Sequence, residues 1–276
     1  GIAKHWTLDI RKFRNDVFTP ESLIANGSMD ENMADFLQAL VLARMNIVIE
    51  GGTGSGKTTL LNALSNYIPD GQRIITVEDT AELNLAKTHV LSLQSRPANN
   101  EGKGEITLQQ LVINTLRQRP DRIVVGECRG PEAFDMLQAM NSGHDGSLTT
   151  THANNPRAAL DRLQNLVQMS RAGSNMPPDA IMKIITEAVD FVVEIKRLPD
   201  GSRRVNNICE VCGMQGNVPT IGSIMKFQKT GVDGNGRIKG EFRPTGSRIV
   251  SEEHKERFYS NGIDIKPEWF DNGGLW

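Results

Sequence analysis

Short apolar runs alternate with helical patterns through the middle of the chain. Several runs rich in aliphatic and β-branched residues are typical of buried strands, namely residues 47–49, 73–79, 89–93, 122–127 and 146–152. Helical periodicity lies between or after them, over residues 57–67, 107–119, 131–140, 155–171 and 178–189. This alternation predicts βαβ units, hence an α/β fold with a mostly parallel sheet that binds its ligand at the C-terminal strand ends.

The two ends of the chain have other patterns. A capping box at Ser28 and Glu31 predicts a helix over residues 28–45. Turn signals at residues 199–201 and 233–236 predict two hairpins, so the sheet is expected to gain antiparallel strands near the C-terminus. Residues 6–14 alternate like the last strand of a preceding domain, and residues 252–259 are expected to be helical.

The loop after the strand at residues 47–49 is rich in glycine. Its sequence, Gly51-Gly52-Thr53-Gly54-Ser55-Gly56-Lys57-Thr58, fits the P-loop pattern without a mismatch. Glycines let successive N–H groups converge on a phosphate at a helix N-terminus, which a glycine-rich turn without a ligand would not need. Lys57 is expected to contact the β- and γ-phosphates, and the Thr58 hydroxyl to ligate Mg²⁺. The predicted nucleotide-binding residues are Gly52, Thr53, Gly54, Ser55, Gly56, Lys57, Thr58 and Thr59.

Acidic residues and a histidine follow three of the predicted strands. Glu127 is the leading candidate, either holding a magnesium-bound water or accepting a proton from the attacking water. Glu78 ends another strand and could take the role that Glu127 does not, with Asp79 beside it. His152 ends the next strand, from which an imidazole could sense the γ-phosphate, and His144 is a weaker candidate. Each of the three acids could also be a solvated loop residue or a helix N-cap, and a single histidine is weak evidence.

Phosphoryl transfer also needs guanidinium charge near the γ-phosphate, often from a neighbouring subunit. The candidates are Arg96, Arg117, Arg119 and Arg129, although a single arginine is more often a surface or salt-bridged residue.

The composition narrows the function classes. The chain has 276 residues, a formal net charge of -2 and 38% hydrophobic residues, which disfavours a nucleic-acid motor because no basic surface is evident. No run of eighteen apolar residues occurs, so we expect no membrane span. Three cysteines provide no disulfide framework and indicate a reducing compartment. Cys209 and Cys212 lie three apart on an expected strand, where they point to opposite faces and cannot both ligate one metal.

Four motifs in order resemble those of the secretion-superfamily ATPases, and most closely the CpaF-like motors of Tad/Flp pili. They are the P-loop, Thr76-Val77-Glu78-Asp79-Thr80-Ala81-Glu82-Leu83 as the Asp box, Gly126-Glu127-Cys128-Arg129-Gly130 as part of an atypical Walker B motif, and the His box from Ser142-Gly143-His144 to Thr151-His152-Ala153-Asn154. The sequence of residues 229–246 resembles that of the pilus motors more than that of the conjugation ATPases of the same superfamily.

The resemblance implies an ATP- and Mg²⁺-dependent motor that powers assembly or retraction of a Tad/Flp-type pilus or a secretion system. The alternatives are a conjugation-type (type IV secretion) ATPase and a nucleotide-gated ring with little turnover. It also implies a RecA-like core over residues 21–214, a C-terminal hairpin and helix appendage over 215–276, and a remnant of an N-terminal lobe over 1–20, whose Arg11 could approach the nucleotide. The expected assembly is a cytoplasmic hexamer, peripheral at the inner membrane through platform proteins.

Overall fold

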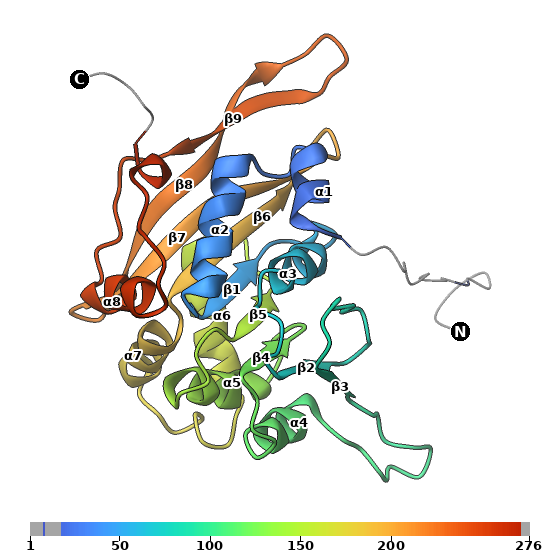
Figure 1. Cartoon of the computed structure of the whole chain (residues 1–276). Coiled ribbons are helices and arrows are strands. Elements are labelled where there is room, and N and C mark those ends of the chain that lie inside the picture. Colours follow the sequence, from blue (N-terminus) through green and yellow to red (C-terminus); the bar gives the residue numbers. More distant parts are fainter. Residues whose placement is uncertain (1–7, 9–17, 272–276) are drawn as a thin grey trace.

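The computed structural model describes residues 8 and 18–271 and has one nine-stranded sheet as its centre (Figure 1). The strand order is β3-β2-β4-β5-β1-β6-β7-β8-β9. The strands are β1 (Ile47–Glu50), β2 (Ile74–Glu78), β3 (Val90–Gln94), β4 (Arg122–Val125), β5 (Leu148–Thr151), β6 (Phe191–Arg197), β7 (Arg203–Gln215), β8 (Val218–Val232) and β9 (Ile238–Pro244). The strand expected over residues 6–14, and Arg11 with it, lie outside the described residues apart from Leu8.

The first six strands of this order run parallel, and β7, β8 and β9 add antiparallel hairpins to the edge beyond β6. The predicted α/β class with a mostly parallel sheet and antiparallel C-terminal additions is thereby confirmed. The helices are α1 (Pro20–Ala25), α2 (Glu31–Leu42), α3 (Lys57–Ser65), α4 (Leu108–Thr115), α5 (Glu132–Asn141), α6 (Pro156–Gln168), α7 (Pro178–Ala188), α8 (Glu252–Ser260) and the 3₁₀ turn η1 (Pro267–Trp269).

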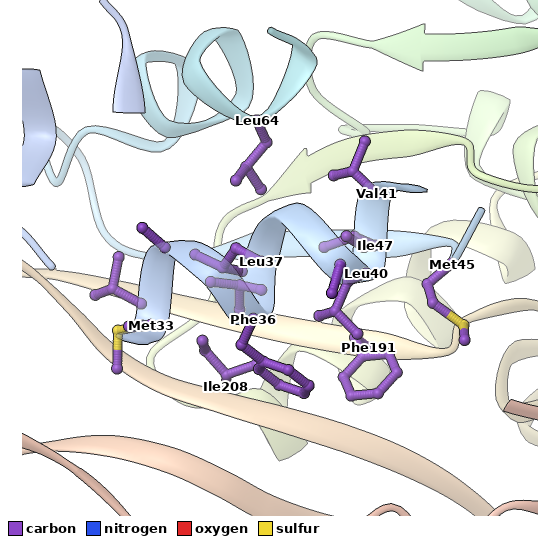
Figure 2. Close-up of a cluster of buried hydrophobic side chains, with 14 of the residues drawn as sticks. Met33, Phe36, Leu37, Leu40, Val41, Met45, Ile47, Leu64, Phe191 and Ile208 are labelled. Carbon is purple, nitrogen blue, oxygen red and sulfur yellow. The ribbon is translucent and has the colours of Figure 1, made fainter. Parts of the chain in front are cut away.

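One face of the sheet is covered mainly by α2 and α3, with the C-terminal segment packed alongside (Figure 1). Apolar residues at helical spacing on α2, including Met33, Phe36, Leu37 and Leu40, are all completely buried. They lie over Phe191 and its neighbours on the sheet (Figure 2). The apolar stripe therefore fixes α2 across the strand that carries the glycine-rich loop.

The opposite face is covered by α4, α5, α6 and α7, whose apolar side chains form a second buried cluster with Val48, Val125 and Val192 of the sheet. All four residues of β1 are buried, because this strand has a parallel neighbour on each side and helices on both faces. This burial gives the loop that follows β1 a rigid origin.

Several element boundaries differ from the sequence-based expectation. Asp30, not Ser28, caps α2, and its carboxylate accepts a hydrogen bond from the N–H of Met33 at 2.8 Å. Helix α4 ends at Thr115, four residues before the predicted Arg119. Strand β8 begins at Val218, well before the turn expected at residues 233–236, and its first half pairs with β7. Strands β8 and β9, which lie in the expected C-terminal appendage, extend the same sheet, as the predicted antiparallel additions require. Within the described residues, no helix combines the length and apolar character needed to cross a bilayer.

Candidate functional site

Residues 51–56 form a loop from the C-terminal end of β1 to the first residue of α3. Gly54 and Gly56 have φ values of 70° and 102°, a left-handed backbone that glycine adopts without strain. Gly51 is needed for another reason, since a Cβ there would lie 2.3 Å from the carbonyl oxygen of Ile195 on the adjacent β6. The glycine spacing thus reflects backbone conformation at two positions and close packing at a third.

The start of α3 faces an open pocket of about 940 Å³. Gly56 is the N-cap of this helix and provides no side chain to accept hydrogen bonds from its first N–H groups. Of the predicted nucleotide-binding residues, Thr53, Gly54, Gly56, Lys57, Thr58 and Thr59 line the pocket. Gly52 and Ser55 belong to the same loop, but their atoms do not line it. This helix terminus is suited to an anion.

Lys57 is almost completely buried and its ammonium group is held inside the loop. Nζ donates hydrogen bonds to the carbonyl oxygens of Gly51 at 3.0 Å and Gly52 at 3.3 Å. It also lies 3.3 Å from Nε2 of His152. Burial lowers the pKa of Lys57, while the carboxylate of Glu127 opposes this shift. The charge therefore sits where the predicted phosphates would bind.

Glu127 and His152 reach the same pocket from the ends of β4 and β5. Oε2 of Glu127 accepts a hydrogen bond from Arg129 at 2.6 Å. Oε1 lies 3.0 Å from Nε2 of His152 but accepts no hydrogen bond from the part of the chain that the structure describes. Burial and the charge of Lys57 lower the pKa of His152, so its imidazole is neutral near pH 7. One carboxylate oxygen is thus left for a ligand.

Glu78 ends β2, next to the strand that leads to Glu127, but its carboxylate contacts the loop after β2. Its Oε1 accepts hydrogen bonds at 2.9 Å from the N–H groups of Glu82 and Leu83. Both of those residues line the pocket, whereas Glu78 does not. Burial raises the pKa of Glu78 against the effect of these hydrogen bonds. This placement suits a residue that holds the pocket wall better than one that acts on water.

The predicted arginines divide into two groups. Arg129 lines the pocket, contacts Glu127, and lies 4.0 Å from a carboxylate oxygen of Asp79. Arg96 donates a hydrogen bond to the carbonyl of Gly104 at 2.8 Å and does not line the pocket. Arg117 and Arg119 are exposed between α4 and the start of β4, at the edge of the sheet opposite the glycine-rich loop. These last three do not reach the pocket of their own chain.

Two arginines that the sequence analysis did not select line the pocket from the start of β7, directly after the turn that follows β6. The guanidinium Nε of Arg203 donates a hydrogen bond to the carbonyl of Gly54 at 2.9 Å, and its Cδ lies 3.2 Å from an ideal Cβ on Gly56. Arg204 lies next to it, over the ring of Phe227. The turn was predicted, but only the position of β6 beside β1 brings it to the glycine-rich loop.

This fold and site define a RecA-like P-loop protein of the nucleotide-binding α/β class. The chain belongs to the type II/IV secretion system protein family, whose sequence profile matches residues 3–252. The predicted membership of the secretion ATPase superfamily is confirmed.

Two relatives and one solved structure show which members of the family this chain is similar to. The chain is 38% identical over 214 residues to a putative conjugal transfer protein of Mycobacterium tuberculosis, covering 78% of this chain and 60% of that one. It is 37% identical over 188 residues to the type IV secretion system protein VirB11 of Bartonella quintana, covering 68% and 52%. The crystal structure of the VirB11 ATPase of Brucella suis with sulphate matches with a TM-score of 0.60 and 34% identity, over 69% of this chain and 54% of that one.

The chain therefore spans little more than half the length of these relatives. Their printed descriptions name conjugal transfer and type IV secretion, and none of these three names a Tad/Flp pilus. The relatives thus support the conjugation-type alternative better than the CpaF-like assignment.

Proposed function

We propose that this chain is the ATP-hydrolysing core of a motor ATPase of the conjugation (type IV secretion) type. The observation that carries the proposal is the convergence of Lys57, Glu127 and His152, from three separate strand ends, in one pocket at the start of α3. A phosphate-binding loop alone would explain nucleotide binding, but the carboxylate beside it is what hydrolysis requires.

The loop and Lys57 would hold the polyphosphate. The N–H groups at the start of α3 would donate hydrogen bonds to a bound anion, and Lys57 supplies a positive charge in a buried setting where it is weakly screened. To contact phosphate, Nζ must free at least one of its three N–H groups from its contacts with Gly51, Gly52 and His152. Arg203 would support the loop through the carbonyl of Gly54.

The pocket fits Mg²⁺. This ion prefers oxygen ligands, and the Thr58 hydroxyl and the Glu127 carboxylate both line the pocket. Oε1 of Glu127 is buried and accepts no hydrogen bond within the described ranges, so a cation or its water would satisfy it. When bound, the ion would neutralise charge on the phosphates during transfer.

Glu127 is the residue that we assign to water activation. Its second oxygen is fixed by Arg129, which leaves Oε1 as the proton acceptor. The neutral His152 lies between Lys57 and Glu127, where it would respond to the presence of the terminal phosphate. Glu78 would act by holding the loop at Glu82 and Leu83.

We propose a hexameric assembly because the sequence motifs resemble those of the secretion-superfamily ATPases. A hexamer would allow Arg96, Arg117 or Arg119 to approach a neighbour's nucleotide, since they do not reach their own pocket. Inner-membrane platform proteins would be the partners, with the motor cytoplasmic and peripheral at that membrane.

We retain the division into residues 1–20, 21–214 and 215–276 as a proposal. A Tad/Flp pilus motor is the second candidate, supported by the sequence of residues 229–246.

The test is ATP turnover by the full-length, ring-forming protein that contains this chain. Steady-state phosphate release that depends on Mg²⁺ and is lost in Glu127→Gln would support the proposal. Tight ATP binding with negligible release would favour the nucleotide-gated ring instead. Stimulation by DNA that falls steeply with salt would indicate a nucleic-acid translocase.

A further inference from the structure

Two carboxyl groups lie side by side inside the protein, directly before the phosphate-binding loop. Glu50 is the last residue of β1 and pairs in register with Glu194 on the parallel strand β6. Their exposed fractions are 0% and 2%. Both side chains project to the sheet face that Val48 and Val192 share, opposite the face covered by α3. Neither residue takes part in the function proposed above.

The two groups have different surroundings. Glu194 lies 2.5 Å from Nζ of Lys196 and accepts a hydrogen bond from Asn206 at 2.6 Å. Neither oxygen of Glu50 has a hydrogen-bond partner among the residues that the structure describes. An unpaired buried carboxylate is costly, and a second negative charge next to Glu194 adds to that cost. The unpaired, fully buried carboxyl of Glu50 is therefore favoured in its protonated form.

Charged groups on the neighbouring elements lower the pKa of Glu50 less than burial and Glu194 raise it. Burial and then Glu194 raise the pKa of Glu50 to about 8, while Lys196 on β6 and Lys57 on α3 lower it. On β7, Cys209 faces both acids, and burial with their charges raises the pKa of its thiol to about 12, so it is neutral. On β5, the residue in register with Glu50 is Thr151, which does not ionise in this range.

The position of Glu50 links this proton to the phosphate site. Glu50 is bonded to Gly51, whose carbonyl accepts a hydrogen bond from Lys57. Glu50 and Lys57 each shift the pKa of the other, so their charges interact through the protein. A negative charge on Glu50 would attract Lys57 and repel a polyphosphate, both of which oppose nucleotide binding.

We propose that Glu50 is a positioning residue that must stay protonated for tight polyphosphate binding, and that loss of this proton releases the nucleotide. The inference rests on the proposed nucleotide binding. By linkage, bound nucleotide must in turn make Glu50 harder to deprotonate.

The first experiment measures the affinity of the purified chain for a fluorescent ADP analogue between about pH 6.5 and 9.5, at constant ionic strength. The variants are Glu50→Gln, which keeps the shape of the protonated acid, and Glu253→Gln, which removes an exposed acid on α8. Over this range the wild type should lose affinity by about fivefold more than Glu50→Gln, the lower end of typical coupling between two sites. Lys57 also loses charge at high pH. Because the charge of Glu50 raises the pKa of Lys57, this loss comes no later in Glu50→Gln than in the wild type, so it cannot make the wild-type profile the steeper one.

Equal pH profiles for the wild type and Glu50→Gln would overturn the proposal. Glu194→Gln provides a second arm, because removing the neighbouring charge should move the sensitive range of the wild-type profile to lower pH. An unmoved range would contradict the pairing.

Unfolding experiments in the absence of nucleotide test whether Glu50 is protonated in the folded protein. Because folding raises the pKa of Glu50 from 4.5 to about 8, the unfolded chain loses this proton first as the pH rises. The melting temperature of the wild type should therefore fall relative to Glu50→Gln between pH 4.5 and 8. A constant difference would overturn the protonated state. Absence of nucleotide binding at every pH would overturn the proposed function and the coupling, while the melting comparison would still decide the protonation.

Discussion

Nε2 of His152 lies 3.0 Å from Oε1 of Glu127, although the two residues follow different strands. The strands β4 and β5 are parallel neighbours, so their C-terminal ends deliver both side chains to the same point. Since the same imidazole is also 3.3 Å from Lys57, the lysine that we propose to contact phosphate and the proposed base are connected through one residue.

The first prediction concerns hydrolysis. Glu127→Gln should lower phosphate release by about 10²- to 10⁴-fold, because the amide cannot accept a proton from water. ATP binding should change little, since the amide keeps a similar shape and leaves the loop intact. Phosphate release and equilibrium nucleotide binding, both measured on the full-length protein, separate the two effects. Normal turnover in this variant would refute the assignment of Glu127.

The second prediction concerns the phosphate contact. Lys57→Ala should weaken nucleotide binding by about 1.5–3 kcal/mol, the usual worth of a hydrogen bond to a charged group. Lys229→Ala removes an exposed lysine on β8 and serves as the matched control. Calorimetric titration with ADP measures both variants. Equal affinities for the two variants would show that Lys57 does not contact phosphate.

The third prediction concerns Arg203, one of the two pocket arginines that the sequence analysis missed. Arg203→Ala removes the hydrogen bond to the carbonyl of Gly54, so the loop should open more often and bind nucleotide several times more weakly. Hydrogen exchange of residues 51–56 should quicken in the same variant. Arg237→Ala, at an exposed position after the β8 turn, should leave both quantities unchanged. Unaltered exchange in Arg203→Ala would mean that the contact does not support the loop.

The fourth prediction concerns pH and a buried histidine. His254 lies between Asp190, at 3.1 Å, and Glu210, at 2.8 Å. Burial alone would lower the pKa of His254, but its hydrogen bonds to these two carboxylates raise it to about 9. Folding thus raises this pKa above the ordinary value of 6.5, so the stabilisation is complete below pH 6.5 and is lost as the pH rises through about 9.

The loss should amount to at most about 3 kcal/mol. Denaturant unfolding at closely spaced pH values measures it, with Glu50→Gln as the background so that the titration of Glu50 does not contribute. A free energy of unfolding that stays constant between pH 6.5 and 9 in this background would contradict the assigned charge of His254.

The fifth prediction concerns the packing that holds α2. Phe36 is fully buried, and its ring centroid lies 6.0 Å from that of Phe191 and 5.3 Å from that of Trp269. Phe36→Ala should cost about 3–5 kcal/mol of unfolding free energy, because it leaves a cavity among three elements. Val232→Ala, at a position with 54% exposure, should cost little. Unfolding by urea compares the two variants.

The glycine-rich loop was predictable because its requirements are local. The residues of the loop, the strand before it and the helix after it follow one another in the chain, so backbone conformation and helix polarity are visible in the sequence. Glu127 and His152 could be selected for a related reason, since alternating strands and helices imply parallel strands whose C-terminal ends meet. The exact helix caps were harder, because Ser28 and Asp30 are both good capping residues and packing decided between them.

By itself the sequence determined the α/β class, the glycine-rich loop, and the acid and imidazole that lie beside it, because each depends on a local pattern or on the direction of parallel strands. The tertiary structure alone decided which strands are neighbours. The pairing of β6 with β1 brings Arg203 to Gly54 and sets Glu194 beside Glu50. Strand order and register arise from contacts between residues far apart in the chain, which no local pattern records.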